Sequence, residues 1–166
     1  MAWFRSAVLL AATLTMGLSA GLFFGYACSV MPGLAKADDR TFVETMQRIN
    51  VAILNGWFLT VFMGALVLAL LAVGLHLGAG QRGPLPWLVA AAVLYVVLVV
   101  VTAAVNVPLN DQLAAAGSLD RIPDLGAVRE QFETTWVRWN TVRAVAGTAG
   151  FGCLVTALVL SGRTTG

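Results

Sequence analysis

The residues best suited to do chemistry lie in one stretch of eight, residues 136–143, with the sequence Trp-Val-Arg-Trp-Asn-Thr-Val-Arg. The stretch stands where a polar loop ends and an apolar run over residues 141–160 begins. In a helix, Trp136, Asn140 and Arg143 would be spaced i, i+4 and i+7 and would share one face. A guanidinium one turn inside an apolar zone is costly unless it meets a polar partner or water, or extends to the interface.

Two interpretations of this stretch are open. In the first, two tryptophans and two arginines form a belt at the membrane interface, with the arginines extending to lipid headgroups. In the second, Arg143 points into the protein and meets Asn106 or Asn110, with Asn50 and Asn140 nearby. Asparagine is not a typical belt residue, so its presence favours the second interpretation, a polar pocket.

The candidate ligand-binding residues are polar or aromatic side chains near the ends of apolar runs. They are Gln47, Asn50, Asn106, Asn110, Trp136, Asn140 and Arg143. In a pocket of low dielectric, amides and a guanidinium could stabilise a developing negative charge. No catalytic residue is assigned, because no carboxylate lies within the apolar runs. A general base would have to come from Glu44 or Glu133 on the flanking polar segments.

No metal site is expected from the metal-binding residue types. One histidine, His76, and two cysteines, Cys28 and Cys153, cannot make a usual zinc or iron site without help. Both cysteines fall inside apolar runs, where a thiol usually serves as a small buried hydrophobe. His76 is expected at the membrane interface.

The composition predicts a membrane protein. Of the 166 residues, 59% are hydrophobic and 11% are charged, with a mean hydropathy of +0.86. Soluble domains carry about 25% charged residues, so this chain has far too few for that class. A net charge of +2 without a basic cluster also argues against a nucleic-acid partner. The expected partners are the lipid bilayer and either a small hydrophobic ligand or another membrane protein.

Four apolar runs predict a single all-α domain over residues 1–166, a four-transmembrane-helix bundle. The expected spans cover residues 7–31, 50–77, 87–105 and 141–160. The second and fourth spans are expected to continue, on one membrane side, into amphipathic helices. For the second span this helix would start at a capping box formed by Thr41 and Glu44.

Proline and glycine positions predict where helices end and where they pack. Pro32 and Pro108 are expected to end the first and third spans. Small residues at a spacing of four predict a face of the first span that packs against another helix. These residues are Thr13, Gly17, Gly21, Gly25 and Ser29, and in the fourth span Gly147, Gly150 and Gly152 allow the same close approach.

The two halves of the chain resemble each other, as in a repeat of two helical hairpins. Each half has a span followed by a proline, a polar loop and an amphipathic segment, with Arg48-Ile49-Asn50 matching Arg138-Trp139-Asn140. The repeat would place Asn50 and Asn140 at one depth. It would also put all eight acidic residues on one side, opposite Arg5, Arg82 and Arg163. Both termini are expected in the cytoplasm and the spans in the cell membrane.

The chain resembles the anthrone oxygenase-like family of integral membrane proteins. The resemblance rests on segments in both halves, namely residues 20–24 (Ala-Gly-Leu-Phe-Phe), 31–34 (Met-Pro-Gly-Leu), 46–50 (Met-Gln-Arg-Ile-Asn), 106–110 (Asn-Val-Pro-Leu-Asn) and 136–143. The chain departs from the family where an Asn-Pro pair is common, since it has Asn55-Gly56 instead. Most members are uncharacterised, and a fungal branch is linked to the oxidation of polyketide anthrones to anthraquinones by O2 with no known cofactor.

Three functions follow from these residues and from the resemblance. A structural or partner-binding role is preferred, because no base stands inside the spans. The first alternative is binding or transport of a small hydrophobic ligand such as a lipid, a quinone or a polyketide. The second alternative, implied by the resemblance, is a cofactor-independent anthrone-type oxygenase. A ligand or an enzyme requires an open cavity beside the polar cluster, whereas a structural role requires a closed and fully hydrogen-bonded one.

Overall fold

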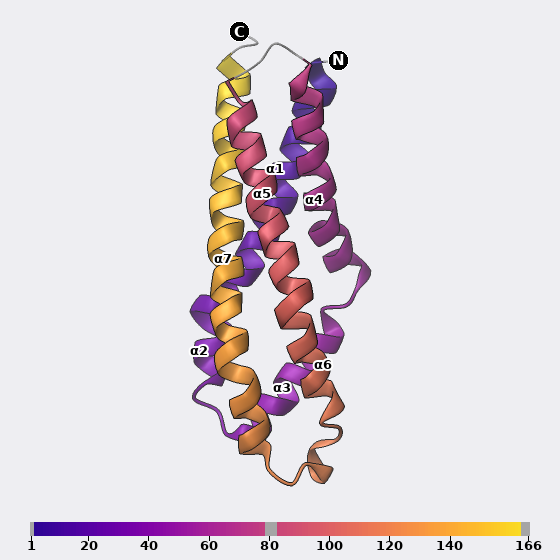
Figure 1. Ribbon diagram of the computed structural model, residues 1–166, viewed down its shortest axis with the longest axis vertical. Coiled ribbons are helices and arrows are strands. Elements are labelled where there is room, and N and C mark those ends of the chain that lie inside the picture. Colours follow the sequence, from indigo (N-terminus) through magenta and orange to yellow (C-terminus); the bar gives the residue numbers. More distant parts are fainter. Residues whose placement is uncertain (1, 79–82, 164–166) are drawn as a thin grey trace.

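The computed structural model describes residues 2–78 and 83–163, which are almost entirely helical and contain no strand. Within these described residues, seven α-helices follow one another along an elongated bundle (Figure 1). They are α1 (Ala2–Gly25), α2 (Met31–Leu34), α3 (Asp39–Ala52), α4 (Gly56–Leu77), α5 (Leu85–Val101), α6 (Val107–Ala115) and α7 (Leu125–Arg163). Two five-residue π-helical stretches join α1 to α2 and α5 to α6.

Four of the helical segments are long and apolar enough to cross a membrane. In the bundle α1 packs against α4 and α7, and α5 packs against the same two helices, so the four spans form a closed ring. The Tyr95 hydroxyl ties this ring together, because it donates to the Phe62 carbonyl on α4 and lies 3.0 Å from Ser19 Oγ on α1. The predicted all-α membrane bundle is confirmed, and the chain is compatible with a multi-pass membrane protein.

The first and third spans do not end at their prolines, contrary to the sequence prediction. The helical segments continue through Pro32 to Leu34 and through Pro108 to Ala115. In both, a π-helical stretch ends directly before the residue that precedes the proline, at Val30 and at Asn106. Proline lacks an N–H and clashes with the carbonyl four residues back, and the wider π-helical turn accommodates both defects. A π-helical stretch before the proline in each half agrees with the predicted repeat.

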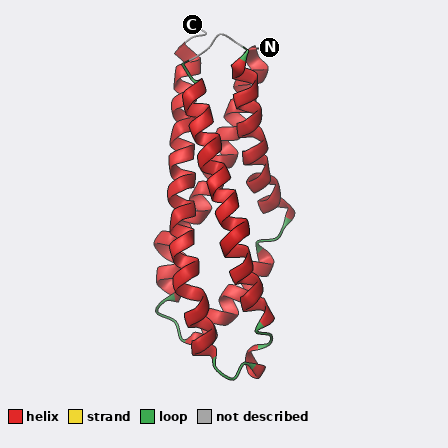
Figure 2. Ribbon diagram, in the orientation of Figure 1, coloured by secondary structure: helices red, strands yellow, loops and turns green. Residues whose placement is uncertain are grey.

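The amphipathic helix before the second span is present, but it does not run into that span. The α3 helix ends at Ala52, and α4 begins only at Gly56 (Figure 2). Asn55 forms the new N-cap, with its side-chain oxygen accepting from the Phe58 N–H at 3.0 Å. The capping box at the start of α3 is also wrong, because Asp38 caps the helix by accepting from the Thr41 N–H at 3.0 Å.

The fourth span and its amphipathic extension form one unbroken helix of 39 residues, as predicted. Asp124 caps it, since its side chain accepts from the Ala127 N–H at 2.9 Å. Close to that end, Arg129 pairs with Asp39 and Glu133 and also donates to two carbonyls of the loop before α3. These contacts hold α3 across the end of the bundle, opposite the end where α1 starts and α7 finishes (Figure 1).

The predicted face of small residues on α1 is only partly packed. A Cβ added at Gly17 would lie 2.9 Å from the Phe151 ring of α7, whereas at Gly21 and Gly25 it would meet nothing within 4 Å. The prediction that Gly21 faces another helix is therefore wrong. Close packing comes instead from α7, where a Cβ at Gly147 would lie 3.3 Å from the Ala20 backbone.

The histidine and the two cysteines stand apart from one another. His76 is in the last turn of α4, and its ring is buried in the bundle, with Nδ1 2.7 Å from the Ala72 carbonyl oxygen. Cys28 is exposed and Cys153 is half-buried, and both are free thiols.

Candidate functional site

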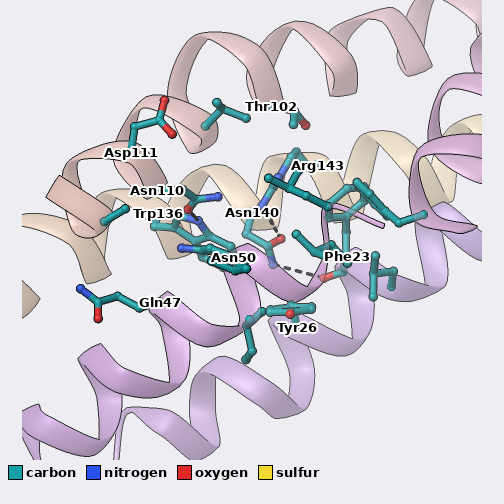
Figure 3. Close-up of a pocket in the computed structure, with 18 residues that line it drawn as sticks. Phe23, Tyr26, Gln47, Asn50, Thr102, Asn110, Asp111, Trp136, Asn140 and Arg143 are labelled. Atoms are coloured by element: carbon teal, nitrogen blue, oxygen red, sulfur yellow. Dashed lines mark hydrogen bonds between the residues drawn. The ribbon is translucent and has the colours of Figure 1, made fainter. Parts of the chain in front are cut away.

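The buried hydrophobic side chains form two clusters, a long core among the four spans and a smaller core beneath α3. A partly open pocket of about 220 Å³ lies where these two cores meet. Phe23 and Phe58 belong to the long core, and Trp136 belongs to the smaller one. The end of α3, the break after it and the first turns of α4 supply one side, while α1, α6 and α7 supply the rest (Figure 3). The lining is mainly apolar, with a few polar groups among the side chains.

Arg143 points into this pocket and not outward to headgroups. Its side chain is 5% exposed, and Nη2 donates to Asn140 Oδ1 at 2.9 Å. The guanidinium carbon lies 4.5 Å from the centre of the Phe23 ring and 5.2 Å from the Trp136 ring. Stacking on aromatic faces stabilises a buried cation. The belt interpretation is therefore wrong for Arg143, although the exposed Arg138 is free to reach the interface.

Asn140 connects Arg143 to the first span. It is fully buried, and its Nδ2 donates to the Phe23 carbonyl at 3.2 Å while its Oδ1 accepts from Arg143. Phe23 lies just before the π-helical stretch that starts at Tyr26. The change in backbone pairing at such a stretch leaves carbonyls open to a side-chain donor. Asn140 therefore orients the guanidinium and at the same time binds α7 to α1.

The predicted contact between Arg143 and Asn106 or Asn110 is wrong, because both asparagines bind Trp136 instead. Asn106 donates to the Trp136 carbonyl at 3.3 Å, and Asn110 Oδ1 accepts from the Trp136 indole N–H at 2.8 Å. Asn110 lines the pocket, and Asn106 does not. Together they fix the indole that forms one wall beside Arg143.

The two candidates on α3 have different surroundings. Gln47 donates to the carbonyls of Leu113 and Gly117, at 2.9 and 3.1 Å, and so ties α3 to the end of α6. Asn50 lines the same pocket as Asn140 and Arg143 (Figure 3), but its Nδ2 is buried without a partner. The Nε of Arg143 is also buried and unpartnered. Two donors at one pocket thus lack acceptors.

Sequence reasoning missed several lining residues, above all Asp111. Its carboxylate lines the pocket from α6, and Tyr26, Thr102 and Phe58 also contribute to the wall. Asp111 was missed because the third span was expected to end before Asn106. Had the helix been continued through Pro108, Asn106, Asn110 and Asp111 would have been placed on one helical segment, the third span. The two bases considered from sequence, Glu44 and Glu133, do not line the pocket and pair with Arg48 and Arg129.

The charged side chains that line the pocket are Arg143 and Asp111. They form no ion pair with each other, and within residues 2–78 and 83–163 no carboxylate lies within 4 Å of the Arg143 guanidinium. The same residues hold no group of three histidines, cysteines or carboxylates that could bind a metal ion.

Comparison with known families gives one match. The family model described as Anthrone oxygenase matches residues 57–153, which is more than half of the 166-residue chain. The chain belongs to the anthrone oxygenase family. No curated protein matched the chain, and no solved structure did.

The match to the anthrone oxygenase family covers one side of the pocket. It includes Asn110, Asp111, Trp136, Asn140 and Arg143, on α6 and α7. It begins at residue 57, in the first turn of α4, and so leaves out the lining residues that come from α1, α3 and the break after α3. The resemblance stated from sequence is thus confirmed over the region that holds the buried guanidinium.

Proposed function

We propose that this protein binds a small, mostly apolar molecule in the pocket beside Arg143. The observation that carries the proposal is an open cavity next to two buried donors, Asn50 Nδ2 and Arg143 Nε, that lack acceptors. A buried donor without a partner costs about 1–3 kcal/mol. A ligand that accepts from these groups would remove that cost.

The lining supports an apolar and partly aromatic ligand. Binding pockets for small molecules are typically concave and apolar, with a few polar groups that fix orientation. Here the rings of Phe23, Phe58 and Trp136 line the pocket, and polar side chains, among them Asn50, Asn140 and Arg143, provide hydrogen-bonding groups. A planar molecule with an oxygen at one end would match this distribution.

The structural role that the sequence favoured has less support. Gln47, Asn106 and Asn110 do join helices to one another. A purely structural cluster would, however, be closed and fully hydrogen-bonded, and this one borders a cavity with unused donors.

Oxygenation of an anthrone-type substrate is a second candidate, favoured by Asp111. The sequence offered no base near the cluster, and this carboxylate lines the pocket. In such a reaction the base takes a proton from the carbon opposite the anthrone carbonyl. The carbanion reduces O2 to a bound hydroperoxide, which loses water to leave the anthraquinone. Arg143 would stabilise the enolate oxygen that forms when the proton leaves.

A pair of neighbouring alanines provides the test of binding. Ala114 lines the pocket, while Ala115 is exposed beside it and does not. With anthrone as the probe and the protein in lipid nanodiscs, we expect saturable binding by the wild type and by Ala115→Phe. Ala114→Phe should fill the cavity and abolish that binding. Equal binding by both variants, or none by the wild type, would contradict the proposal.

The same samples separate binding from oxygenation. If the protein is an oxygenase, the wild type should consume O2 and form anthraquinone, and Asp111→Asn should keep anthrone binding while losing turnover. If anthrone binds without O2 uptake, the oxygenase candidate is rejected and the binding role remains.

We also propose that the protein lies in the lipid bilayer of the cell membrane with both termini in the cytoplasm. The support is the position of Arg5 and Arg163, which lie near the start of α1 and at the end of α7, at the end of the bundle opposite α3 and α6. Arginines next to short tails favour the cytoplasmic side. A green fluorescent protein fused to the C-terminus should fluoresce, and an alkaline phosphatase fused there should be inactive. The reverse pattern would invert the orientation.

A further inference from the structure

The donors and acceptors around the pocket are unbalanced. Asn50 Nδ2 and Arg143 Nε are buried donors without partners, and both belong to side chains that line the pocket. The acceptor that does meet Arg143, Asn140 Oδ1, is a neutral amide oxygen. These two donors therefore lack acceptors, and no negative charge is paired with Arg143.

The protein itself supplies no counter-charge at this point. Among the described residues the ion pairs involve Arg40, Arg48 and Arg129, and none involves Arg143. The guanidinium carbon lies 4.5 and 5.2 Å from the centres of the Phe23 and Trp136 rings, which are neutral and supply no counter-charge. A buried cation without a paired anion is expensive, and an anion that enters the pocket would reduce this cost.

We propose that the molecule bound here is a monoanion whose charged oxygen accepts hydrogen bonds from Arg143 and Asn50. This inference rests on the proposed binding function and adds the charge of the ligand to it. Guanidinium groups bind carboxylates and related oxyanions strongly, through directional N–H groups. The ligand class is thus an amphiphile with one acidic oxygen at one end and an apolar body, such as an aromatic carboxylate or phenolate.

The second charged group of the pocket fixes the orientation of such a ligand. Asp111 lines the wall from α6 and would repel an anionic oxygen placed next to it. The charged end therefore lies at Arg143 on α7, and the apolar body extends toward the α6 side (Figure 3). A dianion with charges at both ends is excluded by the same repulsion.

The test compares two probes of nearly equal shape, naphthalene-2-carboxylate and naphthalene-2-carboxamide. The protein is held in nanodiscs of zwitterionic phosphatidylcholine, so that the bilayer itself carries no net charge. We expect the wild type to bind the carboxylate at least about tenfold more tightly than the amide, as charge-assisted hydrogen bonds require.

Variants then show which residue causes the preference for the carboxylate over the amide. Arg143→Met should abolish the preference for the carboxylate, while Arg138→Met, which removes an exposed arginine of the same helix, should retain it. Because Arg143 is buried and its replacement could disturb folding, Asn50→Leu serves as a second variant. Its amide nitrogen has no partner to lose, so we expect an intact fold and a several-fold weaker binding of the carboxylate alone.

The possible outcomes separate failure of the anion inference from failure of the proposed binding function. Equal affinity of the wild type for both probes would overturn the inference that the ligand is an anion bound by Arg143. A preference for the carboxylate that survives in Arg143→Met would do the same. Either result would leave the proposed binding site in place. If Arg138→Met lost the preference for the carboxylate, that preference would come from surface charge, and the inference would likewise be overturned. Saturable binding of neither naphthalene probe would overturn the anion inference, whereas the binding function itself is refuted only if the wild type also fails to bind anthrone.

Discussion

The two joins between amphipathic helix and membrane span carry the same Arg-x-Asn pattern but differ in structure. In the second half, α7 passes through Arg138, Trp139 and Asn140 without interruption, and both ends of the Asn140 amide are bonded. In the first half, the helix stops two residues after Asn50, and the Asn50 Nδ2 has no partner. One asparagine thus stabilises the bundle, while its counterpart leaves a donor free at the pocket.

The difference arises a few residues beyond the pattern. Asn55 folds back, with its Nδ2 donating to the Ala52 carbonyl and its Oδ1 accepting from the Phe58 N–H. It therefore closes one helix and starts the next. The residues around this break line the pocket, so the interruption creates a wall that a continuous helix could not form. A repeated sequence can thus form a continuous helix in one half and part of a pocket wall in the other.

The largest expected effect is the difference in stability between substitutions of Asn140 and of Asn50. Asn140→Leu should destabilise the protein by about 3 kcal/mol, because it removes the bond to Phe23 and leaves the buried guanidinium without its acceptor. Asn50→Leu should change stability by less than about 1 kcal/mol, since no bond to its amide nitrogen is lost.

Unfolding free energies measured in mixed micelles by denaturant titration would test this pair. Arg143→Met provides the control, and it should cost less than Asn140→Leu, since it removes the cation together with its need for a partner. Similar losses for Asn50→Leu and Asn140→Leu would mean that the two halves are energetically equivalent, contrary to the comparison.

The next effect concerns glycines in the two halves. Gly147→Leu on α7 should cost roughly 1–3 kcal/mol by overpacking, since even a Cβ there would lie 3.0 Å from Leu98 and 3.3 Å from Ala20. Gly21→Leu on α1 should stay within about 0.5 kcal/mol, because a Cβ there meets open space. Thermal denaturation in detergent would measure both, and a larger loss for Gly21→Leu would invalidate the packing described for α1.

A smaller effect is expected at the break. Asn55→Ala should cost about 1 kcal/mol through loss of the N-cap of α4. Asp124→Ala removes the N-cap of α7 at similar cost, but its cap lies outside the pocket. Binding of anthrone should therefore weaken in Asn55→Ala and stay unchanged in Asp124→Ala. Equal binding in both variants would show that the break does not shape the pocket.

The smallest effect is a pH dependence at the start of α3. Hydrogen bonds from the Thr41 backbone N–H, and then from its hydroxyl, hold the pKa of the exposed Asp38 carboxyl below its ordinary value. A depressed pKa stabilises the folded protein above the unfolded-state value and loses this contribution as the pH falls through the folded value. Stability should therefore decline below about pH 4 in the wild type. Asp38→Asn should show less of this decline, and an identical profile would contradict the assignment.

Much of the fold could be predicted because it depends on local composition. Four apolar runs, each about as long as a bilayer is thick, require four spanning helices, since no other open structure satisfies its backbone within lipid. The cap at Asp124 and the continuity of α7 follow from residues adjacent in sequence. The helix face shared by Trp136, Asn140 and Arg143 follows from the helical repeat, and it correctly placed Arg143 on the buried side.

The partners of those residues were decided only by the tertiary structure. Helical spacing tells which side chains share a face, but not which distant backbone that face meets. Asn140 bonds to the Phe23 carbonyl, 117 residues away, and Asn110 bonds to Trp136 instead of Arg143. The third span continues from α5 through Pro108 into α6 and so brings Asp111 to the pocket, and this depends on a π-helical turn that packs against α7. The sequence by itself determined the helices and their buried faces, and packing between distant segments determined the pocket, because contact between helices is a property of the assembled bundle.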